Sequence, residues 1–544
     1  MSKSRSLTVR TGRPLHALGG ALALAGAAAI GVAADADAEP RGAAAAPCTR
    51  FAWQPLPHGA TVTKTEVRTA SGVFPEACIV RGTITSSAVS TITWAVELPD
   101  AATWNGKTLT IGGGGYDGFI PTDSDFHQAV AGPSSVPYVR ISSDSGHTAQ
   151  DLGWALDDTA LANHAFDANH RVVEVGTEIA RQFYGKAPTR RYMIGHSNGG
   201  RSALAAAQRF PDDYDGAIAL APAITQQAHQ INLAAPLKFI FGRRDHWLSP
   251  AKTALYAAAE LRACDGLDGL VDGIINNVEA CKYDPAQLLC RGAESDACLT
   301  WGQVATIKEL YRDHREPLVF ANGTTGYPRF GRGGAATSDW TAYVFGQQFE
   351  NPSSFNLMAG VRAVQYAEGQ PSPPPNSPLP MGLFFAHFPY TPEHLARWLR
   401  ISAFMDTTNP DLTAFADHGG KLLIWYGLAD ACVSVYQTAA YVARVQATMG
   451  ADRVHGFARF VTTGGIGHNL DGPGAKTVDL LAALDAWVTG GVAPDNLVGS
   501  KLSGASPPAV ELQRPLCEYP KYARYDGTGD PGRASSFRCT APGQ

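Results

Sequence analysis

The segment Tyr192-Met193-Ile194-Gly195-His196-Ser197-Asn198-Gly199-Gly200 decides the fold that we predict for this chain. Its first three residues are apolar, as in a buried strand, and the residues that follow it, 201–207, have helix-forming composition. Gly-x-Ser-x-Gly between them predicts a nucleophile elbow, a tight turn that holds Ser197 in a strained conformation above the sheet. Gly195 and Gly199 are needed because side chains there would collide across the turn. The alternative is a chance match in a chain with 57 glycines, but the flanking strand and helix favour the elbow.

The size and charge of the chain limit the possible functions. At 544 residues it exceeds the size at which one hydrophobic core usually stops growing, so we expect two structural units. A net charge of −5 and a charged content of 17% give no basic surface of the kind that binds nucleic acid. A nucleic-acid partner is therefore not expected.

The N-terminus predicts a signal peptide over residues 1–38. Basic residues come first, at Lys3, Arg5, Arg10 and Arg13. An apolar stretch at 15–34 and the small residues Ala36-Asp37-Ala38 follow, which fits a cleavage site. The alternative is a membrane anchor, but the stretch is short and alanine-rich. We expect a secreted protein, extracellular or periplasmic, with no membrane span once the signal is removed.

The nine cysteines suit an oxidising compartment. Eight of them fall as neighbours along the chain, and we hypothesise sequential pairing, although eight cysteines allow many connectivities. The hypothesised pairs are Cys48–Cys78, Cys264–Cys281, Cys290–Cys298 and Cys517–Cys539, which leaves Cys432 over. Each closed loop would stabilise the fold by roughly 2–4 kcal/mol.

Strand and helix patterns alternate on both sides of the elbow. Strands are expected over 92–98, 108–111, 136–141, 215–221, 421–427 and 454–461, and helices over 163–183 and 477–487. Between 223 and 418 this alternation fades, and the region contains a proline-rich piece at 371–380. We therefore predict an α/β core formed by residues 39–222 and 419–544, the latter including a disulfide-bonded tail, with an inserted lid domain at 223–418.

Four glycines, Gly112 to Gly115, directly follow the strand predicted at 108–111. Without side chains, their N–H groups can face a ligand, which suits an oxyanion loop similar to the His-Gly-Gly-Gly type. Phosphate binding is the rival interpretation, but no Lys-Ser/Thr follows and the spacing is not that of a dinucleotide loop. A plain flexible turn is the other alternative. We expect the N–H groups of Asn198 and of a loop glycine, represented by Gly114, to receive an oxyanion.

A serine hydroxyl is a weak nucleophile at neutral pH and needs a base that a carboxylate orients. In α/β-hydrolases these groups follow in the order Ser, Asp or Glu, His, each after a strand. Asp430 follows the strand predicted at 421–427, and His468 follows the strand predicted at 454–461. We therefore predict a triad of Ser197, His468 and Asp430. The alternative is that Asp430 is a turn residue and His468 a surface histidine.

Four other histidines compete with His468 for the role of base. His418 and His455 do not follow a strand end. His196 precedes the serine, so its side chain should point away across the elbow and pack structurally. His147 is expected to hold the structure beside the site.

Three carboxylates, Asp265, Asp268 and Asp272, are spaced three and four residues apart among glycines. Such a loop suits a hard cation with oxygen ligands, although it lacks the pattern and terminal glutamate of an EF-hand. A solvated acidic turn is the alternative. The flanking Cys264 and Cys281 would staple the loop and favour a metal.

Taken together, these motifs resemble the tannase and fungal-type feruloyl esterase family, which also includes mono(2-hydroxyethyl) terephthalate hydrolase. The likeness runs from about residue 48 to the C-terminus. Besides the acidic loop, it covers Gly112–Gly115, Ser143–His147, Trp154–Asp158, Ser197–Arg201, Pro211–Gly216 and Leu423–Asp430. It implies an α/β-hydrolase core with a lid, four sequential disulfides and no organic cofactor.

The resemblance also implies a secreted serine esterase that forms an acyl-enzyme with esters of aromatic acids, namely gallates, hydroxycinnamates such as ferulate, or terephthalate monoesters. It implies a structural Ca²⁺ held by the side chains of Asp265, Asp268 and Asp272 and by the carbonyls of Leu270 and Ile274. Two other functions stay open: an esterase for short aliphatic or polyester substrates, and a non-catalytic, calcium-stabilised binding protein on a hydrolase scaffold.

One departure from the family pattern concerns the elbow. The family typically has a cysteine just before the nucleophile and another just after the catalytic histidine, joined as a disulfide. Here His196 and Asn469 stand at those positions. Because both cysteines are absent together, packing or a hydrogen bond must hold Ser197 against His468.

Overall fold

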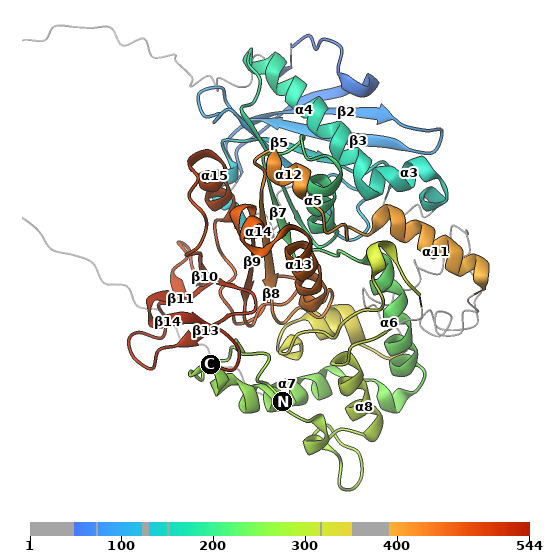
Figure 1. The fold of residues 1–544 in the computed structure, drawn as a ribbon, viewed down its shortest axis with the longest axis vertical. Helices are drawn as coiled ribbons and strands as arrows, with labels where there is room; N and C mark the ends of the chain where they lie inside the picture. Colours follow the sequence, from blue (N-terminus) through green and yellow to red (C-terminus); the bar gives the residue numbers. More distant parts are fainter. Residues whose placement is uncertain are drawn as a thin grey trace, which may run out of the picture. The chain divides into compact units, whose positions relative to one another are not determined.

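A ten-stranded sheet forms the centre of the computed structural model (Figure 1). Its order is β1-β2-β3-β5-β4-β6-β7-β8-β9-β12, in which β5, β4, β6, β7, β8 and β9 run parallel. At its two edges the pairing is antiparallel, through β1-β2-β3-β5 and through β12 on β9. The strand bounds are β1 Thr61–Arg68, β2 Ala77–Thr85, β3 Thr91–Leu98, β4 Lys107–Gly112, β5 Val139–Ser143, β6 Arg190–His196, β7 Gly216–Leu220, β8 Lys421–Gly427, β9 Ala458–Thr463 and β12 Cys517–Glu518.

The structure describes residues 48–49, 51–71, 74–121, 130–148, 153–315, 318–350 and 391–544. The signal peptide predicted at 1–38 and the proline-rich piece at 371–380 lie outside these residues. Within them, no helix has both the length and the apolar character that crossing a bilayer requires.

The helices divide between the core and the connections. Their bounds are α3 Asp158–Ala162, α4 Ala168–Tyr184, α5 Asn198–Arg209, α6 Gln226–Phe241, α7 Pro250–Cys264, α8 Trp301–Leu310, α11 Pro392–Met405, α12 Thr413–Asp417, α13 Val435–Met449, α14 Ala451–Phe457 and α15 Leu480–Gly490. Two small antiparallel sheets complete the tail, formed by β10 Val498–Leu502 with β11 Val510–Pro515 and by β13 Tyr522–Tyr525 with β14 Phe537–Thr540.

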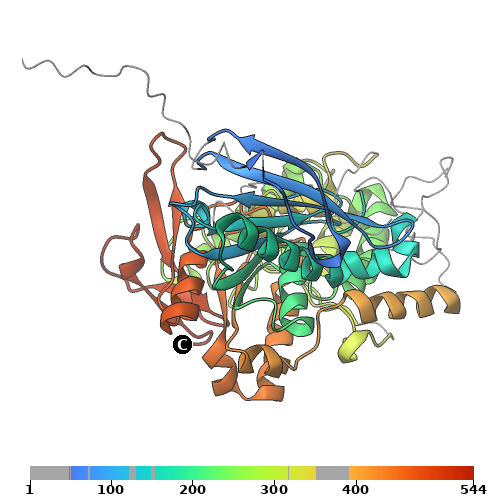
Figure 2. The same cartoon turned by 90° about the horizontal axis from the view of Figure 1, so that it is seen from above.

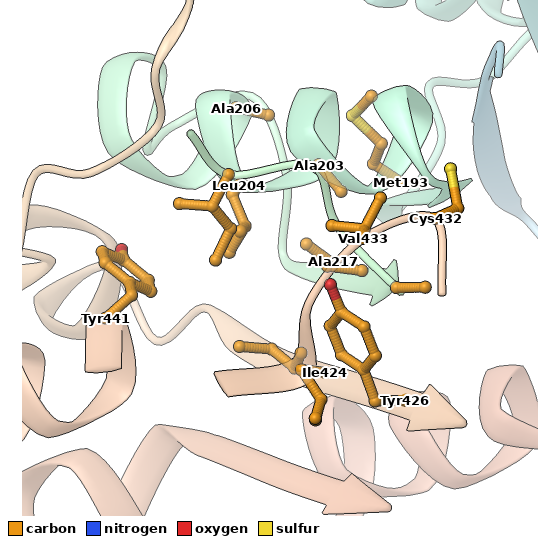
Figure 3. Close-up of a cluster of buried hydrophobic side chains, with 14 of the residues drawn as sticks. Met193, Ala203, Leu204, Ala206, Ala217, Ile424, Tyr426, Cys432, Val433 and Tyr441 are labelled. Atoms are coloured by element: carbon orange, nitrogen blue, oxygen red, sulfur yellow. The ribbon is translucent and has the colours of Figure 1, made fainter. Parts of the chain in front are cut away.

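Successive residues of the parallel strands point into two different hydrophobic cores, as the two-residue period of a strand requires. On β8, Ile424 joins the core that contains side chains of α4, α5 and α13, whereas Trp425 joins the core that contains α15. Figure 3 shows part of the first core, which includes Ala203 of α5 and Ala217 of β7. In Figure 2 the blue strands near the N-terminus lie beside the teal helices. Helices on both sides of the sheet therefore bury its apolar runs.

The long connection between β7 and β8 is an insertion in the sheet order. These strands are parallel neighbours, with Ala219 opposite Ile424, yet about 200 residues separate them. Within the described residues this connection adds no strand to the central sheet, and α6, α7 and α8 lie together at one side of the core in Figure 1. The α/β-hydrolase type of core is confirmed, and the exact limits of the lid at 223 and 418 stay a prediction.

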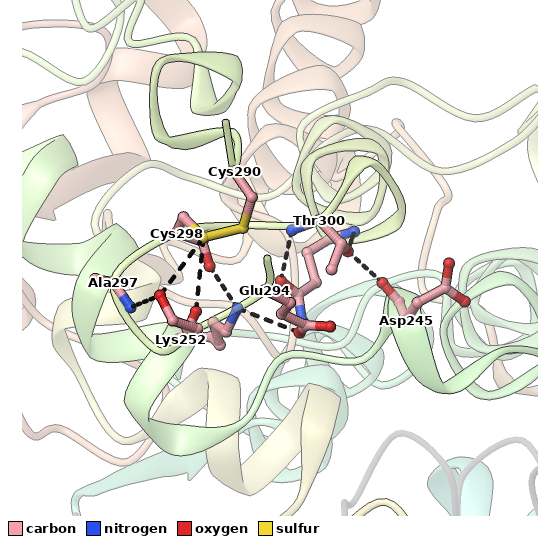
Figure 4. The surroundings of a disulfide bond; sticks show 9 residues. Asp245, Lys252, Cys290, Glu294, Ala297, Cys298 and Thr300 are labelled. Carbon is pink, nitrogen blue, oxygen red and sulfur yellow. Dashed lines mark hydrogen bonds and ion pairs between the residues drawn. A yellow bond between two sulfur atoms is a disulfide. The ribbon is translucent and has the colours of Figure 1, made fainter. Parts of the chain in front are cut away.

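All four sequential disulfides are present and Cys432 is free, as predicted; the structure also shows that Cys432 is buried. Figure 4 shows the disulfide that closes the shortest loop, Cys290–Cys298 in the insertion, whose cysteines are 8 positions apart. The ammonium of the buried Lys252 donates to the carbonyl of Cys298 and lies 3.3 Å from a carboxylate oxygen of Glu294. This disulfide is thus anchored to α7 by a buried cation.

The strand predicted at 454–461 was partly wrong. Its first four residues belong to α14, and β9 begins only at Ala458. The buried side chains of α14 are Val454 and Phe457, three residues apart, which is a helical spacing. Smaller shifts occur elsewhere: β5 begins at Val139 rather than at 136, and α15 begins at Leu480, where the side chain of Asp479 accepts a hydrogen bond from the Ala482 amide.

Candidate active site

Ser197 lies in the turn between β6 and α5, and its backbone has φ 60° and ψ −118°. A non-glycine residue in this region is strained by about 1–3 kcal/mol, and the surrounding packing must hold it there. Its amide donates to the Leu220 carbonyl of the neighbouring strand at 2.9 Å. A Cβ on Gly195 would lie 2.2 Å from the Gly199 carbonyl oxygen. The turn can therefore close only with glycine at that position, as the sequence predicts.

The three predicted catalytic side chains meet at the carboxyl ends of their strands. His468 Nε2 lies 3.0 Å from Ser197 Oγ, and His468 Nδ1 lies 2.7 Å from Asp430 Oδ2. All three residues are buried. Burial disfavours the charged imidazole, but the carboxylate of Asp430 outweighs it and raises the pKa of His468 well above its usual range. This is the geometry of an activated serine nucleophile.

Asp430 is itself oriented by backbone donors. Its Oδ1 accepts from the amides of Cys432 and Val433, each at 2.8 Å, so that Oδ2 is left toward the imidazole. Both donors lie in the turn that follows β8. The carboxylate is thus fixed by its own loop. Its position directly after a strand was therefore enough to identify Asp430 in the sequence.

Asp339 is a fully buried residue of the insertion that the sequence did not predict. It connects the loop that carries His468 with the loop that carries Asp430. Its carboxylate accepts from the amide of His468, at 2.8 and 3.0 Å, and from the amide of Ala431 at 2.8 Å. A Cβ on Gly467 would lie 2.6 Å from Asp339 Oδ1, so the histidine loop needs glycine there. Burial, followed by the nearby charge of Asp430, raises the pKa of Asp339 to about 7.

The glycine loop after β4 lies against the elbow. A Cβ on Gly112 would meet Gly199 at 3.0 Å, and one on Gly113 would lie 1.9 Å from Asp117 Oδ1. The side chain of Asn198 donates to Asp117 Oδ2 at 2.9 Å and to the Gly113 carbonyl at 3.3 Å. The loop and the residue after the nucleophile are therefore joined, as an oxyanion hole requires. The choice of Gly114 as the oxyanion donor stays a prediction.

A buried polar network supports this loop from behind, and its members were not assigned from the sequence. Asp117 also accepts from the Ser145 hydroxyl at 2.8 Å, and burial raises the pKa of its carboxyl to about 7. Arg201, fully buried on α5, donates to Asn198 Oδ1 at 2.8 Å and to the Ala165 carbonyl at 2.7 Å. In the sequence, the available signals for these residues were that Asp117 lies within the glycine loop and that Arg201 directly follows the elbow.

The competing histidines have other partners. His147 Nε2 lies 2.7 Å from the Tyr116 carbonyl oxygen, consistent with the structural role expected of it. His418 and His455 lie beside carboxylates of Asp212 and Glu518. His196 packs structurally, but against the triad itself, because the centroid of its ring lies 4.5 Å from that of His468. The expectation that it points away from the site was therefore wrong.

Asn469, where the family has its second cysteine, is held by the insertion. Its side-chain oxygen accepts from the hydroxyl of Tyr343, and its Nδ2 donates to Ser338 Oγ at 3.2 Å. The Tyr343 ring also stands edge-on to the His468 ring, with centroids 5.2 Å apart. Ring contacts and hydrogen bonds thus surround the histidine loop at the two positions where the disulfide is missing.

The acidic loop folds around its own carboxylates. Asp265 accepts from the amides of Gly273 and Ile274 at 2.9 and 3.2 Å, and the guanidinium of Arg514 pairs with Asp272. Burial raises the pKa of Asp268 to about 6, and the charges of Asp272 and Asp265 add to this effect. The loop thus brings carboxylate oxygens together, which are the ligand type that a hard divalent cation prefers, and Arg514 balances only part of their charge.

The chain is similar to known proteins over most of its length. A sequence model of the family described as "Tannase and feruloyl esterase" matches residues 78–540. The chain is 30% identical to the mono(2-hydroxyethyl) terephthalate hydrolase of Piscinibacter sakaiensis, over 87% of this chain and 86% of that protein. It is 33% identical to an uncharacterized esterase of Agrobacterium fabrum, over 82% of each chain. Among solved structures, feruloyl esterase B from Aspergillus oryzae matches with a TM-score of 0.76 and 26% identity, covering 91% of this chain and 99% of that one.

Proposed function

Because the chain belongs to the tannase and feruloyl esterase family of carboxylic ester hydrolases, we propose that it is a secreted serine esterase for esters of aromatic acids. One observation carries the catalytic part of this proposal: Ser197, His468 and Asp430 form a continuous chain of contacts at 3.0 and 2.7 Å. A non-catalytic binding protein would not need a strained serine aligned with a buried imidazole and carboxylate.

The reaction follows from these contacts. Ser197 Oγ attacks the ester carbonyl while His468 Nε2 takes the hydroxyl proton, and the same nitrogen then gives that proton to the leaving alcohol. Asp430 keeps the Nδ1 proton facing itself and stabilises the imidazolium that forms. Water attacks the acyl-enzyme by the same route in reverse. The backbone N–H groups of Asn198 and Gly114 are proposed to receive the oxyanion, and losing one such donor typically costs about 3 kcal/mol.

The substrate class rests on the relatives. Feruloyl esterase B and mono(2-hydroxyethyl) terephthalate hydrolase are named for esters whose acid part is aromatic. Their likeness spans 87% and 91% of this chain. We therefore place the acid among gallates, hydroxycinnamates and terephthalate monoesters.

The test compares wild type with Ser197→Ala on methyl gallate, methyl ferulate, mono(2-hydroxyethyl) terephthalate and p-nitrophenyl butyrate. We expect higher kcat/KM for at least one aromatic-acid ester than for the butyrate, and a loss of about 10⁴-fold or more in the variant with an unchanged melting temperature. An organophosphonate should label Ser197 with a stoichiometry of one per chain. A preference for the butyrate would refute the substrate class, and an unlabelled Ser197 would refute the mechanism.

Secretion is proposed from the N-terminal pattern and the disulfides. Disulfides persist in oxidising compartments, and this chain has four of them. Mass spectrometry of the protein recovered outside the cytoplasm should show a chain that begins near residue 39. A full-length chain retained in the cytoplasm would contradict the proposal.

A structural Ca²⁺ is proposed for the acidic loop, where Asp265, Asp268 and Asp272 together with the carbonyls of Leu270 and Ile274 would hold it. The ion would balance buried charge and would not touch the triad chemistry. At a calcium concentration 100 times its Kd, binding would stabilise the fold by about 2.7 kcal/mol. After EDTA treatment and dialysis, added CaCl₂ should therefore raise the melting temperature of wild type but not that of Asp268→Asn. A wild type whose melting temperature does not respond to CaCl₂ would overturn the calcium proposal.

A further inference from the structure

Three side chains away from the triad form a compact set of metal-ligating groups. His58 lies in the short 3-10 turn η1 (Pro57–Gly59), while His170 and Glu174 lie four residues apart, on one face of α4. Within the described part of the chain, one ligand atom from each of the three lies within 4.8 Å of the others. We propose that His58, His170 and Glu174 bind a divalent transition metal of the Zn²⁺ class.

The second side of His170 is already arranged as in a metal site. Its Nδ1 lies 2.7 Å from Asp213 Oδ2, and its ring is stacked on Phe210 with centroids 4.1 Å apart. The stacking and the hydrogen bond fix the ring plane and leave Nε2 as the nitrogen for a ligand. Histidines that bind zinc usually donate the other ring N–H to a carboxylate, which sets the tautomer and makes the ligand nitrogen more basic.

The remaining ligands need only a small adjustment. His58 Nε2 and Glu174 Oε2 are 2.7 Å apart, a hydrogen bond that a metal ion would replace by two coordination bonds. Two imidazoles and one carboxylate are a donor set for Zn²⁺, with metal–ligand distances of about 2.0–2.2 Å, and the fourth position is open to water. Imidazole and carboxylate donors without thiolate also suit Ni²⁺ and Cu²⁺, so the geometry selects this class and not Ca²⁺.

A metal at this position would tie two separate parts of the chain together. η1 precedes β1, the edge strand of the sheet, and α4 covers the face of the sheet on which α5 packs. Binding to the folded state alone would raise stability in proportion to the logarithm of the metal concentration. The site is thus a staple between the beginning of the folded region and its core.

The test is calorimetric titration of ZnCl₂ into the full-length, EDTA-treated protein, dialysed into buffer with excess CaCl₂ so that the acidic loop is saturated. We expect one strong site in wild type, at least 100-fold weaker binding in His58→Ala and in His170→Ala, and a loss of about 10- to 100-fold in Asp213→Asn. His455→Ala is the matched control, because His455 also lies beside a carboxylate, that of Glu518, at 3.6 Å. Melting temperatures in EDTA show whether each variant folds. Equal zinc affinity in wild type, His58→Ala and His170→Ala would overturn the proposal, as would the absence of submillimolar binding in wild type.

A second inference, which rests on the proposed function, concerns Asp339. Its carboxylate holds the amide of His468 and the amide of Ala431, which is the neighbour of Asp430 in the chain. Both members of the His–Asp pair are therefore located by one acceptor from the insertion. We infer that Asp339 is a positioning residue that sets the distance between the imidazole and its carboxylate.

Substitution by asparagine isolates this role. An amide has one acceptor oxygen and a donating NH₂ group. Both loop N–H groups donate to Asp339 Oδ2, and the His468 N–H also contacts Oδ1, so in either orientation the NH₂ group of Asp339→Asn would face the His468 N–H. A misplacement near 1 Å at a catalytic group can cost about 10²-fold in rate. We expect kcat to fall about 10- to 100-fold with little change in KM, because the carboxylate contacts the loops and not the substrate.

The matched control is Asp406→Asn. Asp406 is also a buried carboxylate in the insertion, with a pKa raised to about 7 by burial, and it accepts from the Gln227 amide and the Ser402 hydroxyl. Both variants should lose stability, but only Asp339→Asn should slow the phosphonylation of Ser197. Equal phosphonylation rates in wild type and Asp339→Asn would overturn this inference alone, whereas failure to label Ser197 in wild type would overturn the proposed function.

Discussion

The two halves of the catalytic site are held in place by different means. The serine half is a contact between backbones, in which Gly199 lies against the carbonyl of Gly112 and the Ser197 amide donates to Leu220. The histidine half is held by side chains of the insertion, chiefly Asp339 and Tyr343.

The difference teaches where the site is sensitive to substitution. A backbone contact depends on the absence of side chains, so only a bulkier residue disrupts it, and local sequence is enough to encode it. A side-chain clamp depends on the donor and acceptor pattern of residues that are distant in the chain. Nearly isosteric substitutions should therefore be enough to slow the reaction when they fall in the histidine half, whereas the serine half should respond to one added methyl group.

The largest effect is expected when the histidine half loses its charge, in Asp430→Asn. Without the carboxylate, the imidazole tautomer is no longer fixed and the imidazolium is not stabilised, so kcat should fall about 10⁴-fold with the fold intact. Asp430 raises the pKa of His468, so its removal lowers that pKa. A protonated imidazole cannot accept the serine proton, and the rate falls as the pH drops through this pKa. The acidic limb of the kcat/KM profile should therefore move to lower pH.

The control for this profile is Asp417→Asn, which changes an exposed carboxylate paired with Arg453. Its pH profile should match that of wild type. An acidic limb that stays in place in Asp430→Asn would mean that the limb reports another group, and Asp339, whose pKa is raised to about 7, would be the first to test.

The serine half can be broken by one methyl group, in Gly199→Ala. The new Cβ would lie 2.5 Å from the Gly112 carbonyl oxygen, so the elbow and the glycine loop must separate. We expect a loss of about 1–3 kcal/mol in the free energy of unfolding. A loss of about 10²- to 10³-fold in kcat should accompany it, as expected when an oxyanion donor is displaced. Denaturant unfolding and steady-state kinetics would measure the two effects.

Gly456→Ala is the matched control for that substitution. Gly456 lies in α14, and a Cβ there would have no atom within 4 Å. Alanine favours a helix over glycine by about 1 kcal/mol, so this variant should be neutral or more stable, with unchanged kcat. If Gly199→Ala behaved in the same way, the close contact between loop and elbow would not hold the site.

The same contrast explains how much the sequence could predict. Ser197, Asp430 and His468 could be identified because each follows a strand with a clear apolar pattern, even though the strand before His468 was drawn four residues too early. That error arose because the apolar spacing here is ambiguous. Val454 and Phe457 lie three positions apart, as on one face of a helix, and one face of a strand would place them two or four positions apart, a difference of only one position.

Asp339 could not be identified, for a physical reason. It lies 91 positions before Asp430, in a region without periodic pattern, and its role depends on the tertiary fold that brings it to the histidine loop. The contact of His196 with His468 escaped for the same reason, because an elbow fixes the direction of the serine and not the partner that the preceding side chain meets. Backbone geometry can be read locally, whereas side-chain clamps from an insertion cannot.

The smallest expected effect tests whether the histidine half depends on hydrogen bonds or on packing, in Tyr343→Phe. The substitution removes the hydroxyl that donates to Asn469 but keeps the ring that stands edge-on to His468, with centroids 5.2 Å apart. The loss of one hydrogen bond should lower the free energy of unfolding by about 0.5–1.5 kcal/mol. Because Asp339 still holds the His468 amide, kcat should fall only a few-fold.

The matched control is Tyr525→Phe in the tail, which also loses one hydrogen bond from a hydroxyl to a carbonyl. It should lose as much stability as Tyr343→Phe and leave kcat unchanged. A fall in kcat as large as that of Asp339→Asn would place the Tyr343 hydroxyl beside the carboxylate as an equal part of the clamp, and the ring contact would then contribute little.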